Sequence, residues 1–375
     1  MLVTRLVGFL LVALLFYFCC FSSRAAAQSG TPAWQAEWEK TVARATNEGK
    51  VVVSVPASSE FRKATTEAFR KRFGIDAEMI TGRAATIVRR IADGIKSDIH
   101  EFDVHIGGSS SLVSGLLPDG LLEPVSPWLI LPEVREPKNW WGGHMWVDRD
   151  QTYIYSSQAY LTDSIWYNSS MVRPEEIRSY NDLLQPSWSG KIGFLDPRTP
   201  GAGDSTWAHL WKVKGEEYLK KLVAQKLFIS RDQRVLAENL ARGTSAMVLG
   251  LVYYSYLPFI KAGLPIKPLP IPKEGTYGTG GSGNLAILKK PPHPNATKVF
   301  VNWFLGKEGQ EIFTRIIGQG TRRLDVDTKS LKEIGVVAAK DQLTIEKFLE
   351  LENQSEERLQ KVRGPASILA EKLLR

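Results

Sequence analysis

The chain has 375 residues, of which 43% are hydrophobic and 10% aromatic, and its formal net charge at pH 7 is +8. This hydrophobic content excludes a disordered chain, and the basic residues are dispersed among acidic ones, so we expect no nucleic-acid partner. Single cores stop growing at roughly 250–300 residues, so a chain of this length predicts two globular lobes.

The N-terminus has the three parts of an export signal. Arg5 supplies a positive charge, residues 6–21 include no charged side chain, and Ala25 and Ala27 place small side chains before a cleavage site. The apolar run is shorter than the roughly 20 residues that cross a membrane. We therefore predict a signal peptide over residues 1–27, cleaved during export, with an uncleaved N-terminal anchor as the alternative.

Both cysteines of the chain, Cys19 and Cys20, lie inside this segment. A chain that begins at Gln28 has no thiol. Removal of the signal peptide therefore excludes disulfide bonds, thiolate metal ligands and cysteine nucleophiles in the mature protein.

Residues 28–150 read as the first part of one lobe. Runs of β-branched and apolar residues alternate with segments of helical spacing. The expected strands are 50–55, 77–81 and 103–106, and the expected helices are 61–73, 84–95 and a segment from Ser109. Strands that alternate with helices predict a parallel sheet with helices on its faces.

Residues 151–284 read as the second lobe, entered through an extended segment at 153–167. We expect strands at 191–195 and 246–254 and helices at 205–213 and 215–225. Residues 285–375 return to the first lobe, beginning with a strand at 284–289, and continue as a long amphipathic helix at 295–315 and charged, solvated helices at the C-terminus. Two crossings between the lobes suit a hinge, and a cleft between lobes is a usual place for a ligand.

Small and polar residues follow several of the expected strands and precede helices. The candidate ligand-binding residues at these turns are Ser58, Ser59, Arg83, Ser109, Ser110, Gly201 and Gly203. The unpaired N–H groups at the start of a helix bind anions, and ligands of open α/β sheets lie beyond the carboxyl ends of the strands. Ordinary helix capping is the alternative for each turn.

Tyr253 and Tyr254 follow the strand-like run at 246–252. At a strand end both side chains can turn into a cleft, where tyrosinate oxygens would be hard ligands for ferric iron. The alternative is that these aromatic rings fill the hinge or line a pocket for an organic ligand.

Three segments resemble the type II periplasmic solute-binding proteins of ABC importers, specifically the ferric-iron-binding branch. They are Asn181-Asp182-Leu183-Leu184-Gln185-Pro186-Ser187-Trp188-Ser189-Gly190-Lys191-Ile192, Asp196-Pro197-Arg198-Thr199-Pro200-Gly201-Ala202-Gly203, and the region from Pro292 to Gln310. The resemblance implies an α/β fold of two lobes that close on a ligand like a Venus flytrap, each with a mixed, mainly parallel sheet, joined by a two-strand hinge. It also adds Arg198 to the candidate ligand-binding residues.

The resemblance further implies a periplasmic, monomeric receptor that delivers its ligand to an inner-membrane permease. It implies that Tyr253 and Tyr254 coordinate Fe(III) as cargo, with a synergistic anion at helix N-termini and no resident cofactor. The chain departs from the branch after its first strand, where Ser58 and Ser59 stand in a turn that often has a histidine. A small organic anion such as a phosphonate or a carboxylate stays open as the ligand. A ligand-presenting sensor and an enzyme on the same fold are the alternatives of other classes, although no coupled acid–base pair is visible.

Overall fold

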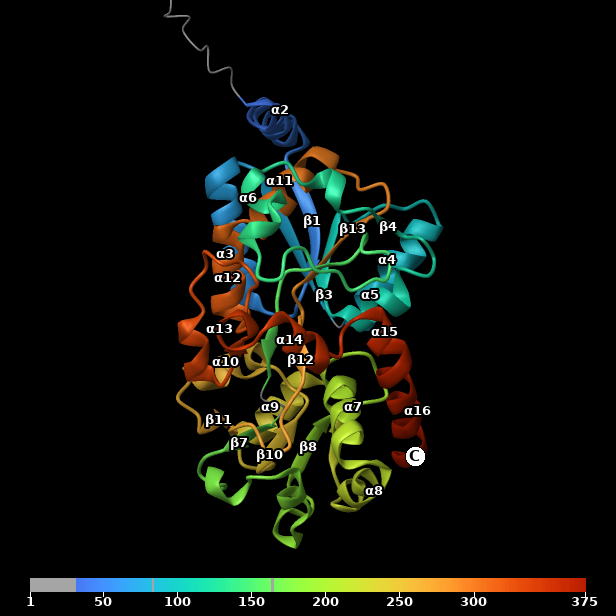
Figure 1. Ribbon diagram of the computed structural model, residues 1–375, viewed down its shortest axis with the longest axis vertical. Coiled ribbons are helices and arrows are strands. Elements are labelled where there is room, and N and C mark those ends of the chain that lie inside the picture. Colours follow the sequence, from blue (N-terminus) through green and yellow to red (C-terminus); the bar gives the residue numbers. More distant parts are fainter. Residues whose placement is uncertain (1–31, 83, 163–164) are drawn as a thin grey trace, which may run out of the picture.

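The computed structural model describes residues 32–82, 84–162 and 165–375, which form two lobes, one above the other in Figure 1. The predicted signal peptide over residues 1–27 and the candidate Arg83 lie outside these ranges. Within them, no helix is both long and apolar enough to cross a membrane.

The first lobe is built on a six-stranded sheet in the order β2-β1-β3-β13-β4, with β5 paired to β13. Strand β1 is parallel to β2 and β3, whereas β13 is antiparallel to its neighbours. The strands are β1 (Lys50–Val55), β2 (Asp76–Thr81), β3 (Val104–Gly107), β4 (Leu122–Glu123), β5 (Tyr155–Ser156) and β13 (Asn284–Leu288).

Successive residues of β1 explain why both faces of this sheet are covered. Val51 and Val53 point into a core shared with one set of helices, while Val52 points into a second core on the opposite face. The first set is α2 (Ala33–Glu48), α3 (Ser59–Phe73), α11 (Pro294–Leu305) and α12 (Lys307–Ile317), and the second is α4 (Ala84–Lys96) and α5 (Ser109–Gly115). A continuous valine run is what a strand buried on both faces requires.

The second lobe has a five-stranded sheet in the order β11-β7-β10-β8-β9. Its strands are β7 (Ile165–Asn168), β8 (Ile192–Leu195), β9 (Phe228–Ser230), β10 (Met247–Leu249) and β11 (Ile266–Pro268). Met247 and Leu249 face a core with α7 (Ala202–Lys214) and α8 (Glu216–Ala224), and Val248 faces a core with α9 (Gln233–Ala241) and α10 (Tyr253–Lys261). This sheet is mixed, because β8 is parallel to β9 and β10 while β7 is antiparallel to β10.

A small third sheet lies between the lobes. It consists of β12 (Gly278–Thr279), β6 (Tyr160–Leu161) and β14 (Val337–Ala338), so both crossing segments are part of it. The predicted α/β fold of two lobes with mixed sheets is therefore confirmed, but the sheets are not mainly parallel as expected, because antiparallel pairings with β13 and β7 are at least as many as the parallel ones. The hinge sheet has a third strand, β14, which the sequence did not reveal.

The predicted extents of two elements were wrong. The helix expected at 295–315 is two helices, because Gly306 is extended at φ −71° and ψ 173° and caps both of them. The strand expected at 246–254 ends at Leu249, and Tyr253 is the first residue of α10.

The C-terminal residues were expected to form solvated helices, and instead they contact both lobes. Residues 352–374, which we call the C-terminal strap, include α15 (Glu356–Arg358) and α16 (Gly364–Leu373) and follow α13 (Ala339–Gln342) and α14 (Ile345–Leu351). Leu359 is buried in a core of the first lobe, whereas Ala366 and Leu369 are buried in a core of the second. In Figure 1 the strap runs down one side of the molecule, with α16 beside α7.

Candidate ligand-binding site

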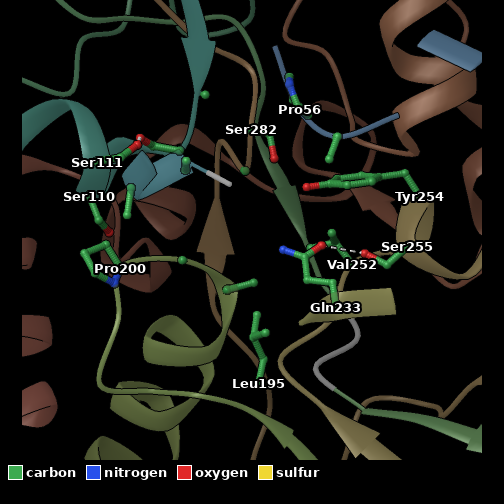
Figure 2. A pocket seen from close by; sticks show the side chains of 18 of the residues that line it. Pro56, Ser110, Ser111, Leu195, Pro200, Gln233, Val252, Tyr254, Ser255 and Ser282 are labelled. Carbon is green, nitrogen blue, oxygen red and sulfur yellow. Dashed lines mark hydrogen bonds between the residues drawn. The ribbon is translucent and has the colours of Figure 1, made fainter. Parts of the chain in front are cut away.

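A cavity of about 920 Å³ lies between the two lobes and is closed on one side by the hinge sheet. Figure 2 shows it from close by, with side chains converging from both lobes. The hinge contributes Tyr160, Thr279 and Ser282 to its lining. The cavity therefore occupies the position between the lobes in which a hinged protein encloses a ligand.

The wall from the first lobe consists of segments that follow strands. The end of β1 contributes Ser54 and the turn after it, β3 continues through Gly107 into the serines of α5, and α4 begins at the cavity with Ala84. The carboxyl ends of parallel strands meet at one edge of the sheet, which explains how these distant segments come together.

The wall from the second lobe consists mainly of helix starts. Gly201 and Ser205 belong to the start of α7, Gln233 to the start of α9, and Tyr254 and Ser255 to the start of α10. The Gln233 Oε1 accepts a hydrogen bond from Ser255 Oγ at 2.8 Å, which holds α9 and α10 together at the cavity (Figure 2). Together with α4, the helices α7 and α10 direct their N-terminal N–H groups and positive dipole ends to this space, whereas the first N–H groups of α9 are bonded to Asp232.

The charged side chains of the lining favour an anion. Arg231 pairs with Asp196 at 2.9 Å, and Arg363 of the strap pairs with Asp204, but Arg234 is exposed and has no acidic partner among the described residues. The one carboxylate in the described lining, Asp232, accepts hydrogen bonds from two backbone N–H groups as the cap of α9. Among the described lining residues, the cavity therefore has a guanidinium without an acidic partner, and its one carboxylate is bonded to the backbone at a helix start.

Three tyrosines line the cavity, and all three are held in the neutral form. Burial raises the pKa of Tyr277 to about 12 and that of Tyr160 well above 10, and it also raises the pKa of Tyr254, although a hydrogen bond to Ser282 opposes that shift. Tyr254 projects into the cavity with its hydroxyl toward Ser282 (Figure 2). The phenols can donate hydrogen bonds to a ligand at neutral pH.

Residues 51–315 match the family described as bacterial extracellular solute-binding proteins. The chain belongs to this family. The family and the fold are those of the binding components of ABC transporters rather than of enzymes, and a permease is the partner that the family implies.

Individual relatives differ in what their names say they bind. Iron uptake protein A1 of Synechocystis is 26% identical in an alignment of length 261 that covers 64% of this chain and 67% of that protein. Iron-bound HitA from Pseudomonas aeruginosa covers 86% of this chain and 99% of its own at 20% identity and a TM-score of 0.62. AfuA from Actinobacillus pleuropneumoniae, solved with fructose-6-phosphate, has the same coverage and identity and a TM-score of 0.63. The fold is thus shared with ferric-binding proteins of this branch and also with a protein that was solved with a sugar phosphate.

Four of the residues expected at the binding site of this solute-binding protein line the cavity: Ser109, Ser110, Gly201 and Tyr254. Ser58 is instead the cap of α3, where its Oγ accepts a hydrogen bond from the Phe61 N–H, and Ser59 is exposed outside the lining. Helix capping, the alternative that the sequence left open, therefore accounts for Ser58.

Tyr253 does not share the cavity with Tyr254. Its ring packs against Gly318 and lies 6.2 Å from the ring of Trp166, between centroids. The two tyrosines are successive residues of a helix, so their side chains point about 100° apart. The expectation that both turn into the cleft rested on a strand that ends before them.

Arg198 and Gly203 are adjacent to the cavity and have structural partners. Arg198 is engaged by Asp196 through two hydrogen bonds, and its Nη1 donates to the Leu374 carbonyl at the end of the strap. A Cβ on Gly203 would collide with the Leu195 carbonyl oxygen, so this glycine lets α7 approach the end of β8. Neither residue is in the lining.

Sequence reasoning missed several residues of the lining, namely Ser54, His105, Arg234, Ser255, Ser282 and Arg363. For Arg234 a signal was present, because Asp232 follows a short apolar run and precedes a helical segment, as a helix cap does. For Arg363 the sequence has no local signal, since the strap reaches the cavity only through tertiary packing.

Proposed function

We propose that this receptor captures a small organic anion that has a phosphate or phosphonate group and delivers it to an inner-membrane permease, after export with cleavage of residues 1–27. The observation that carries the proposal is the convergence of three helix starts, those of α4, α7 and α10, and of the unpaired Arg234 on one cavity. Each helix start is a ready anion site, and a guanidinium binds phosphate oxygens through two parallel hydrogen bonds.

The size of the cavity supports an organic solute. About 920 Å³ is near the upper end of the roughly 300–1,000 Å³ that small-molecule sites occupy. The neutral phenols of Tyr254 and Tyr277 and the hydroxyls of Ser255 and Ser282 add hydrogen-bond partners without adding charge. This combination suits a ligand with one anionic end and a polar, uncharged body.

Ferric iron with a synergistic anion is the second candidate, supported by the three tyrosines in the lining. Against it, the described residues contain no group of three histidine, cysteine or carboxylate side chains that could hold a metal ion. Tyr253, the other half of the adjacent pair, packs outside the cavity. Iron would therefore depend on phenols that burial keeps protonated.

The test is a calorimetric titration of the mature protein with fructose 6-phosphate, methylphosphonate, inorganic phosphate, citrate and ferric citrate. We expect the phosphorus-containing anions to bind and Arg234→Gln to weaken them by about tenfold or more. Arg242→Gln, at the end of the same helix and paired with Glu238, is the matched control and should change nothing. If only ferric citrate binds, and a visible charge-transfer band appears, the ligand is iron and the proposal of an organic anion is overturned.

A further inference from the structure

Two buried polar atoms of the first-lobe wall have no hydrogen-bond partner among the described residues. They are Nε2 of His105 and Oγ of Ser110, on side chains that are only 2% and 6% exposed. Both residues line the cavity. An unsatisfied buried polar group costs about 1–3 kcal/mol, so two of them on one wall indicate a place where a ligand supplies the missing partners.

The position of the His105 ring is fixed by its surroundings. Nδ1 lies 3.0 Å from the Ser54 Oγ, which occupies one side of the ring. Gly107 is on the same side of β3, two residues further on, and a Cβ there would collide with Nε2. The missing side chain at Gly107 therefore leaves room for the ring to lie toward the cavity end of the strand.

The chemistry of this wall differs from that of the opposite one. Burial lowers the pKa of His105 to about 4, so the imidazole is neutral at pH 7. A neutral imidazole donates from one nitrogen and accepts at the other, and the serine hydroxyl can do both. A ligand hydroxyl, which also does both, matches either tautomer, whereas neither His105 nor Ser110 offers a phosphate a positive charge.

We propose that His105 and Ser110 form a subsite for hydroxyl groups, which binds the uncharged end of a ligand whose anionic end lies at Arg234. This inference rests on the proposed function and narrows the ligand to a hydroxylated phosphate ester. The first lobe then binds the hydroxyl groups of the ligand and the second lobe binds its anionic group, so a ligand has to span the cavity to contact both.

The test compares fructose 6-phosphate with inorganic phosphate on the wild type and on His105→Leu. We expect His105→Leu to raise the Kd of fructose 6-phosphate about tenfold or more, and to change that of inorganic phosphate less than about twofold. His209→Leu is the matched control: His209 is also a buried, neutral histidine, bonded to the Gly275 carbonyl outside the lining, and its replacement should leave the ratio of the two Kd values unchanged.

Failure of the subsite and failure of the proposed function give different results. If the wild type binds fructose 6-phosphate and His105→Leu keeps the wild-type ratio, the subsite is overturned and the anion receptor stands. If His105→Leu weakens both probes equally, His105 belongs to the anion site and the subsite is again overturned. If neither probe binds the wild type, both proposals are overturned.

A measurement without ligand separates recognition from a structural role. Ser54→Ala with His105→Leu removes both partners of one hydrogen bond together with the unsatisfied nitrogen, so the urea midpoint of the ligand-free protein should stay unchanged or rise. A clear fall of the midpoint would mean that His105 is a structural histidine, and it would overturn the subsite.

Discussion

Arg363 and Asp204 form a buried ion pair across 159 residues of sequence. The Arg363 Nη2 donates to Oδ1 at 2.5 Å and its Nε donates to Oδ2 at 3.1 Å, while the Gly201 N–H donates to Oδ1 at 2.9 Å. Asp204 is in the first turn of α7, whose start forms part of the cavity wall. The pair therefore joins the C-terminal strap to the ligand-binding site.

Replacing Arg363 by Met should destabilise the protein strongly, because Asp204 would be left as a buried charge without its cation. Breaking a buried pair in this way costs about 3–5 kcal/mol, measurable as the free energy of urea unfolding. Arg358→Met, on a partly exposed residue of the same strap, is the control and should have little effect. Equal losses in the two variants would contradict the structural role of the pair.

Stability should fall as the pH is lowered from 6.5 to about 4. Burial lowers the pKa of both His105 and His209 to about 4, below the ordinary value of 6.5. Between these values the unfolded chain binds protons that the folded protein does not, so each histidine can contribute a slope of about 1.4 kcal/mol per pH unit. Urea unfolding across this range checks the prediction, and His209→Gln should make the slope shallower. An unchanged slope would mean that His209 is protonated in the folded protein.

The two adjacent tyrosines should differ in their effect on ligand binding. Tyr254→Phe removes a hydroxyl from the cavity and should weaken a bound anion by about 0.5–1.5 kcal/mol, roughly two- to tenfold in Kd. Tyr253→Phe, outside that cavity, should leave the Kd unchanged. A ferric titration of both variants is the complementary measurement: a visible band abolished by either single substitution would show that both phenols reach one iron.

Gly203→Ala should lower the stability of the protein more than its affinity for the ligand. The added Cβ would collide with the Leu195 carbonyl, which is backbone and cannot move without shifting β8 or α7. We expect a loss of about 1–3 kcal/mol, seen as a lower melting temperature. Gly364→Ala is the control, because a Cβ there meets only the Leu359 carbonyl at 3.4 Å. If the Gly203→Ala protein has wild-type stability and binds the anion more weakly, Gly203 acts in ligand binding and not in packing.

The architecture was predictable because its signals are local. The valine run of β1 and the phenylalanines of α3 each indicate a strand or a helix from a short window, and their alternation indicates the class of sheet. The turns after strands also directed attention to Ser109, Ser110 and Gly201, which the structure places on the cavity.

Other parts of the site could not be predicted, because their signals are ambiguous in the sequence or arise only from tertiary packing. The run 246–254 is apolar throughout, and periodicity cannot tell a buried strand from a strand that passes into a helix, so the direction of Tyr253 was misjudged. His105 has no local sequence signal, and its unsatisfied nitrogen is visible only in three dimensions. Arg363 reaches Asp204 through packing of a segment that lies beyond the family match.

The strap has a consequence for the kinetics of the receptor. It bonds to the first lobe through the Glu356 N–H and the Val147 carbonyl, and to the second through Arg363, so we expect separation of the lobes to load these attachments. The fraction of molecules in the binding-competent arrangement scales the apparent affinity, and attachments that resist opening should slow dissociation. We therefore expect receptors with the same cavity but different C-terminal tails to hold the same solute for different residence times.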